Sequence, residues 1–87
     1  MTFIVQCYRI SRQAKYKVFF EYHKEVVSRI KEIEMDLRKW DSIDKCWVLH
    51  TRGLFELIKK YQNSDKIHFN FPDENGRVKF IEQIKKI

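Results

Sequence analysis

The sequence predicts an α+β domain, in which helices cover one face of a largely antiparallel sheet, with the element order β-β-α-β-β-α-β-α. Short segments of alternating apolar and polar residues predict the strands, and segments with apolar residues at helical spacing separate them. The chain has 87 residues, of which 44% are hydrophobic and 15% aromatic, with only two glycines and one proline. This length supports one core, so residues 1–87 are expected to form a single domain.

The first two segments are expected to pair as a β-hairpin. Residues 3–10 (FIVQCYRI) are rich in β-branched and aromatic types, and Phe3, Val5 and Cys7 can share one face. In residues 16–22 (YKVFFEY) every even-numbered residue is apolar, whereas the odd-numbered ones are mixed. The connecting SRQAK places Arg12 and Lys15 at the tip of this hairpin.

From His23 the pattern changes to that of an amphipathic helix. Its apolar residues recur at helical spacing, at Val26, Val27, Ile30 and Ile33. Two short strands, roughly residues 36–40 and 45–50, then flank the turn-forming stretch DSID and predict a second hairpin.

Alternation along this second hairpin assigns its side chains to two faces. It places Arg38 with Trp40 on one face and Lys39 on the other. In the next strand Trp47 and Leu49 lie opposite Cys46, Val48 and His50. At least one of Trp40 and Trp47 is expected to fill the core.

The last third of the chain predicts a helix, a strand and a tail. Thr51 is the expected N-cap of a helix with the apolar stripe Leu54, Phe55, Ile58 and Tyr61. Residues 66–71 (KIHFNF) alternate as a half-buried strand before Pro72. After the turn-rich DENG, residues 77–87 favour a helix with Val78, Ile81 and Ile84 inward, and a strand is the alternative.

The residue types that carry catalysis or bind metals are not arranged for either. Cys7 and Cys46 are expected to be free thiols, because the N-terminus lacks the features of a secretion signal. The cysteines and histidines lack the paired spacing of a zinc site, and two isolated glycines cannot form a phosphate-binding loop. We therefore expect no catalytic residue, metal, cofactor or small-molecule substrate for this chain alone.

The positive charge points to a polyanionic partner. The net charge is +6, and residues 1–20 contain four basic residues and no acidic one. No apolar run approaches the roughly 20 residues that span a bilayer, so an intracellular protein of the cytoplasm or nucleus is expected. Such a basic surface attracts nucleic acids. The candidate phosphate contacts are Arg9, Arg12, Lys15, Lys17, Arg38, Lys39, Lys45 and Arg52, and the candidate base-stacking residues are Trp40, Trp47 and Tyr8.

A motif in the middle of the chain adds a family resemblance. The strand and helix KVFFEYHKEVVSRIKEI, then RKWD, a polar turn, KCWVL and the helix with LFELIKKY together resemble the HARP-type module found ahead of superfamily 2 motors in annealing and fork-remodelling helicases, and similar domains of phage and viral helicases. The resemblance covers roughly residues 17–62. It implies a module that engages branched or partly single-stranded DNA during repair and recombination, with Arg38 and Lys45 as DNA contacts and Trp40 and Trp47 as framework or stacking residues.

Two functions therefore follow as expectations. The first is a non-catalytic nucleic-acid-binding module, with DNA as the favoured partner, that assists a helicase motor; the chain would then be the N-terminal part of a longer, ATP-dependent helicase. The alternative is a protein-interaction domain of a small viral or phage protein, which docks on a factor of the host cell through an aromatic patch.

Overall fold

The computed structural model describes residues 2–86, and it confirms the predicted order of strands and helices. The strands are β1 (Phe3–Arg9), β2 (Lys15–Phe19), β3 (Arg38–Asp41), β4 (Cys46–His50) and β5 (Ile67–Asn70). The helices are α1 (Lys24–Lys31), the short 3-10 helix η1 (Met35–Leu37), α2 (Thr51–Lys60) and α3 (Glu74–Ile84). None of the helices within residues 2–86 has the length and apolar character needed to cross a membrane.

The five strands form one sheet in the order β3-β4-β2-β1-β5. Three of the four neighbouring pairs are antiparallel, and only β1 and β5 run parallel. The two predicted hairpins, β1–β2 and β3–β4, are therefore confirmed, and they join through the β2–β4 pair. The sequence did not indicate that β5 would return to the far side of β1.

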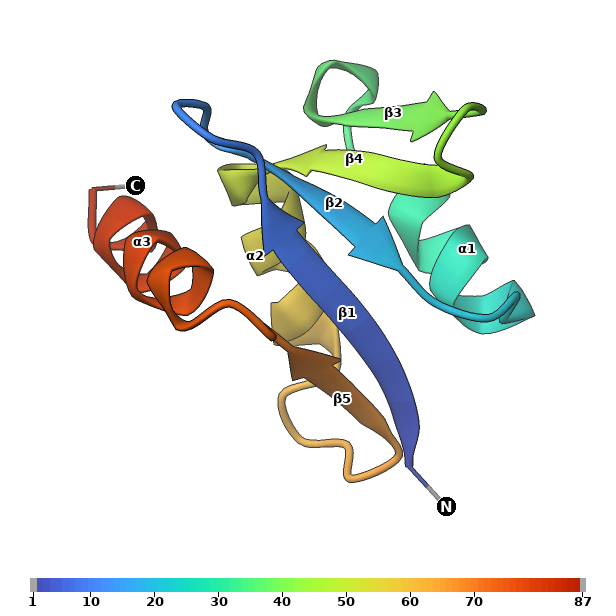
Figure 1. The fold of residues 1–87 in the computed structure, drawn as a ribbon. Coiled ribbons are helices and arrows are strands. Elements are labelled where there is room, and N and C mark those ends of the chain that lie inside the picture. Colours follow the sequence, from blue (N-terminus) through green and yellow to red (C-terminus); the bar gives the residue numbers. More distant parts are fainter. Residues whose placement is uncertain (1, 87) are drawn as a thin grey trace.

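Helices cover one face of this sheet and leave the other open (Figure 1). Directly opposed strand residues share a face, and the pairs Cys7 with Val18 and Tyr16 with Leu49 are all buried. These side chains form one core with apolar residues of the three α-helices, including Ile30, Leu54, Leu57 and Phe80. In Figure 1, α1 and α2 lie behind the sheet, so the viewer faces its open side.

Two predicted strand ends are wrong. Residues 36 and 37 belong to η1, in which the Leu37 N–H donates to the Glu34 carbonyl at 2.9 Å, so β3 begins at Arg38. Strand β2 ends at Phe19, before the predicted end at Tyr22, whose side chain is 79% exposed. The alternating pattern continued past the last residue that has a neighbouring strand to pair with.

The second helix begins with a different cap from the one predicted. The ring Nδ1 of His50 accepts from the Arg52 N–H at 3.1 Å, which makes His50 the N-cap. Thr51 is the first helical residue and is buried, with its hydroxyl 2.8 Å from the Gln83 side-chain oxygen and 3.1 Å from the Ala14 carbonyl. Thr51 thus connects α2 to α3 and to the first hairpin.

The tail is a helix, as preferred, but it starts earlier and turns a different side inward. Asp73 caps it by accepting from the Asn75 N–H at 3.1 Å, so the turn-rich DENG stretch supplies the first helical turn. Phe80 is the buried aromatic residue of α3, whereas Val78 is 39% exposed. Ile84 packs against the edge of the core as predicted.

Both cysteines are buried as free thiols, which confirms that prediction. Burial raises the pKa of the Cys7 thiol to about 12. The pKa of Cys46 is also raised, first by burial and then by the nearby Asp41 carboxylate. Neither thiol is therefore activated as a nucleophile, because a reactive cysteine requires a lowered pKa.

Replacing each of the two glycines by alanine is expected to change the stability of the protein in opposite directions. A Cβ atom at Gly53 would lie 3.0 Å from the Leu37 carbonyl oxygen and 3.2 Å from Ile33 Cγ2. Gly53→Ala is expected to destabilise the protein by about 1–2 kcal/mol, because overpacking outweighs the gain in helix propensity. At Gly76 the nearest atom, Arg9 Cβ, is 3.5 Å away, so Gly76→Ala should stabilise by about 0.5–1 kcal/mol. Urea denaturation measures both, and equal effects would contradict the close approach at Gly53.

Candidate nucleic-acid interface

The open face of the sheet carries a row of side chains that crosses four strands. Tyr8 on β1 lies opposite Lys17 on β2, which lies opposite Val48 on β4 and, beyond it, Lys39 on β3. At the usual spacing of strands this row is roughly 15 Å long. In the neighbouring row Lys15 lies opposite His50. The fold therefore brings three of the predicted basic residues, from β2 and β3, onto one uncovered face.

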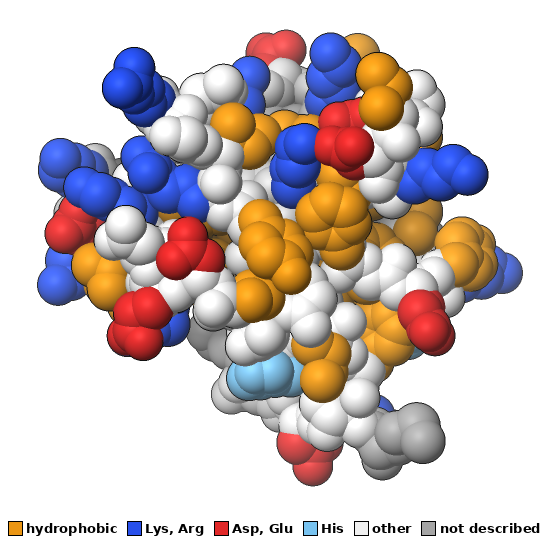
Figure 2. Space-filling view, in the orientation of Figure 1, with side chains coloured by type: hydrophobic (Ala, Val, Ile, Leu, Met, Phe, Trp, Pro, Cys, Tyr) orange, Lys and Arg blue, Asp and Glu red, His pale blue; other side chains and the backbone are white. Residues whose placement is uncertain are grey.

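An aromatic cluster lies beside these lysines. Tyr8 and Phe19 meet edge to face, with ring centroids 5.6 Å apart, and Tyr8 remains 41% exposed. Together with Gln6 and Lys17 they line a shallow depression. In Figure 2, which views this face, apolar side chains gather at the centre, and many of the Lys and Arg side chains lie along the upper and left margins with some acidic ones among them.

Carboxylates of the β3–β4 turn neutralise part of this charge. The Lys17 ammonium forms an ion pair with Asp44, and this hydrogen bond raises the pKa of Lys17. Asp41 holds the turn by accepting from the N–H groups of Asp44 and Ile43, at 3.1 and 2.9 Å, and these bonds lower the pKa of Asp41. Lys15 and Lys39 form no ion pair with any residue in the range 2–86. They are the cations of this face that are free for a ligand.

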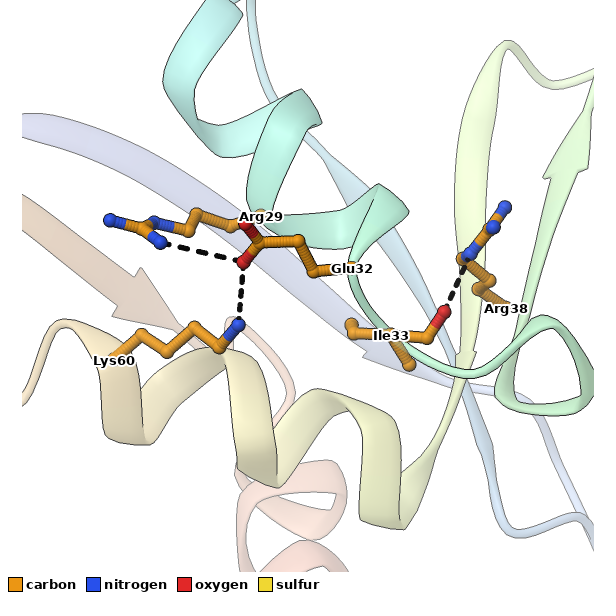
Figure 3. A network of polar contacts seen from close by, with 5 residues as sticks. All are labelled: Arg29, Glu32, Ile33, Arg38 and Lys60. Atoms are coloured by element: carbon orange, nitrogen blue, oxygen red, sulfur yellow. Dashed lines mark hydrogen bonds and ion pairs between the residues drawn. The ribbon is translucent and has the colours of Figure 1, made fainter.

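Two predicted phosphate contacts lie on the opposite, helix-covered face. Arg9 is opposite Tyr16, and its Nε is buried without a hydrogen-bond partner among the described atoms. Arg38 is opposite Leu49, and its Nε donates to the Ile33 carbonyl at 2.9 Å (Figure 3). Arg38 thus links the start of β3 to the end of the α1 segment. We therefore leave both arginines out of the candidate interface.

The remaining predicted contacts lie at the borders of the sheet. Arg12 and Lys45 occupy the tips of the two hairpins in the left-handed backbone region, with φ of 63° and 52°. Both are exposed, and neither forms an ion pair within the described part of the chain. Arg52 lies in the first turn of α2 and faces Glu56 at 3.8 Å. Arg12 and Lys45 can extend the positive surface, whereas Arg52 belongs to the helix layer.

Basic residues of the helix layer are largely paired. The Glu32 carboxylate forms ion pairs with the Lys60 ammonium at 2.8 Å and with the Arg29 guanidinium at 3.4 Å (Figure 3). Both interactions lower the pKa of Glu32, and the hydrogen bond from Lys60 has the larger effect. On α3, Arg77 and Lys79 each face a glutamate three residues away in sequence. Lys24, Lys31 and Lys59 of these helices form no ion pair within residues 2–86, so what distinguishes the open face is the alignment of its free lysines in adjacent strands.

The two tryptophans lie opposite each other on β3 and β4. Their rings meet edge to face with centroids 5.4 Å apart. Trp47 packs against the core, whereas Trp40 is 49% exposed at the edge of the sheet. The expectation that one of them fills the core is met only in part, because Trp47 is partly buried against the core and not inside it. Both point to the helix side, away from the row that contains Lys39.

Two parts of this interface were not evident from the sequence. Gln6 and Asn70 join β1 to β5 on the open face through a 2.8 Å hydrogen bond between their amides, and Val48 separates Lys17 from Lys39. Strand alternation already predicts that Gln6 and Tyr8 share one face. The position of Asn70 next to it required the parallel pairing of β1 with β5.

No family model, curated protein or solved structure matches this chain. The HARP-type resemblance therefore stays a prediction that depends on the motif of residues 17–62. In the structure this motif comprises β2, α1, η1, the β3–β4 hairpin and α2. Its Trp40 and Trp47 form the ring contact of that hairpin, and its Arg38 binds a backbone carbonyl.

Proposed function

We propose that this chain is a non-catalytic module that binds unpaired nucleic acid, with single-stranded DNA favoured, across the open face of its sheet. The observation that carries the proposal is the row of Tyr8, Lys17, Val48 and Lys39, one from each of four adjacent strands, with no helix above it. Lys15 adds a second free cation one row away.

In the proposed mechanism basic side chains bind the phosphates, and an aromatic ring stacks on a base. Lys15, Lys39 and Arg12 neutralise phosphates, which releases condensed counterions and gives affinity without sequence selectivity. The exposed ring of Tyr8, held at its edge by Phe19, offers a surface on which one base can stack. A duplex keeps its bases stacked on each other, so only an unpaired strand can use both kinds of contact.

The family resemblance supports the choice of DNA and of a motor partner. HARP-type modules act beside a superfamily 2 motor, and a chain of this kind would need such a motor for ATP hydrolysis. In this proposal the module holds the unpaired arm of a branched junction while the motor moves along the duplex. Branched DNA with a single-stranded arm is then the expected ligand of the full assembly.

Fluorescence anisotropy with a labelled oligothymidylate tests the proposal. The protein should bind this single strand more tightly than a duplex of equal length, and a forked DNA as tightly as the single strand. The logarithm of the affinity should fall with the logarithm of the salt concentration at a slope of about −2, if three cations each neutralise one phosphate. A slope near zero, or a preference for the duplex, would contradict the proposal; tighter binding of an RNA strand would replace DNA as the ligand.

A protein-interaction domain is the second candidate, and it is favoured by a different observation. Several large apolar side chains are exposed outside the row of Tyr8, Lys17, Val48 and Lys39, and Tyr22, Met35, Trp40 and Ile43 are the most prominent of them. Large apolar surface on a soluble domain often marks a site for another protein. Analytical ultracentrifugation combined with the anisotropy titration separates the two: self-association without nucleic-acid binding favours this second function.

A further inference from the structure

A small aromatic pocket lies between the β3–β4 hairpin and the start of α1. Its volume is about 140 Å³, and its lining includes Phe20, Tyr22, Val27, Trp40, Lys45 and Trp47. Pockets for drug-sized ligands measure about 300–1,000 Å³, so this one has room for little more than a single planar group. It lies on the opposite side of the hairpin from Lys39, as the alternation of β3 requires.

The walls of this pocket are large rings that remain in contact with solvent. Tyr22 is 79% exposed and Trp40 is 49% exposed. Trp40 does not move freely, because the edge contact with Trp47 holds its ring 5.4 Å from a partner that packs against the core. Two exposed rings, one of them held in place, offer flat surfaces to another flat group.

The charge at the pocket indicates what kind of group would enter. Lys45 is the one charged residue in its lining, and it forms no ion pair within the part of the chain that the structure describes. A nucleotide combines a planar base with an anionic phosphate, which matches rings beside one cation. An aliphatic side chain of a partner protein would use the rings and leave the cation without a counter-charge.

The pocket and the proposed interface share Trp40 as a lining residue. A groove of about 410 Å³ on the surface is lined by Lys15, Lys39 and Trp40, among others. Trp40 therefore borders both this groove and the aromatic pocket. A nucleic-acid strand that binds along Lys15 and Lys39 reaches the edge of the sheet at Trp40. There it can place one base in the pocket.

We propose that this pocket receives one unpaired nucleobase of the strand bound on the open face, stacked on Trp40 and with its phosphate at Lys45. The inference rests on the proposed function, because the strand is brought to the pocket by the lysines of the open face. It adds to that function a defined site for a single base at the edge strand, where the hairpin can separate one nucleotide from its neighbours.

Trp40→Ala tests this site by anisotropy with oligothymidylate. Its affinity should fall about tenfold, which corresponds to about 1.4 kcal/mol, while the salt dependence stays unchanged. Met35→Ala is the matched control, because Met35 is exposed but lines neither the pocket nor the groove. Lys45→Gly suits the left-handed backbone at φ 52°. With Lys45 as a fourth phosphate contact the salt slope becomes about −2.8, and this variant should return it to about −2.

A second measurement observes the Trp40 ring directly, without removing it. In a Trp47→Phe variant Trp40 is the remaining tryptophan, and its fluorescence should be quenched by oligothymidylate but not by an abasic strand of equal length. Equal loss of affinity for both strands in Trp40→Ala would assign a structural role to the ring and overturn the base site. Unchanged affinity in Trp40→Ala, together with loss of binding on charge reversal at Lys15 and Lys39, would overturn the base site and leave the proposed function standing. Absence of binding by the unmodified protein would overturn both.

Discussion

Charge reversal of the two free lysines on the open face, Lys15→Glu with Lys39→Glu, is expected to weaken binding of single-stranded DNA about 100-fold at low salt. Each substitution replaces an attraction to phosphate by a repulsion, and a tenfold loss for each corresponds to about 1.4 kcal/mol. Both side chains are exposed and form no ion pair within residues 2–86, so folding stability should change by less than about 0.5 kcal/mol. Anisotropy measures the affinity, and circular dichroism verifies the fold.

A matched variant separates the position of the charge from its amount. Lys24→Glu with Lys66→Glu also lowers the net charge of +6 by four, but these lysines lie at the start of α1 and in the segment before β5. This control should lose no more than a few-fold in affinity, through the long-range field of the protein alone. Equal losses in the two double variants would show that net charge, and not the open face, governs binding.

Tyr16→Ala is expected to lower the free energy of unfolding by about 3–5 kcal/mol. Tyr16 is 0% exposed, and its ring meets those of Phe71 and Phe80 at centroid distances of 6.1 and 5.4 Å. Its hydroxyl donates to the Gln83 side-chain oxygen at 2.7 Å. The residue therefore connects the centre of the sheet to α3 by packing and by a hydrogen bond. Urea denaturation measures the loss, and a change below about 1 kcal/mol would contradict this role.

Tyr16→Phe removes only the hydroxyl, and its effect on folding stability is expected to depend on pH. It should cost about 1 kcal/mol at neutral pH, because the ring stays and one hydrogen bond is lost. Burial raises the pKa of Tyr16 from 10.0 to about 12, so between these values the unfolded chain loses a proton that the folded protein keeps. Stability from this group is thus present below about pH 10 and lost as the pH rises toward 12. Tyr16→Phe should lose less stability than the unmodified protein between pH 8 and about pH 11; equal losses would contradict the raised pKa.

The faces of the strands could be predicted from the sequence, because side-chain alternation is a local property. Val5, Cys7 and Val18 were placed in the core by this rule, and the structure buries all three. The same rule placed Arg38 with Trp40, and opposite Lys39. It could not separate a phosphate contact from a structural arginine, since that depends on the Ile33 carbonyl, which the turn after α1 brings close to Arg38.

The order of the strands could not be predicted, because it depends on contacts between distant segments. Lys17 and Lys39 share one row, with Val48 between them, only because β2 pairs with β4. The rotation of α3 was also missed. Gly76 lies close to Arg9 of β1, and Phe80, one turn later on the same side of α3, is buried whereas Val78 is exposed.

The parallel contact between β1 and β5 has a consequence for biosynthesis. Residues 3–6 pair with residues 67–70, so a growing polypeptide cannot complete this sheet until residue 70 has left the ribosome. Until then one backbone edge of β1 stays unsatisfied, next to apolar side chains such as Phe3 and Val5. Nascent chains from which residues 67–70 have not yet emerged should therefore recruit chaperones and be sensitive to proteases. Chaperone binding and protease sensitivity should both end once these residues have left the ribosome.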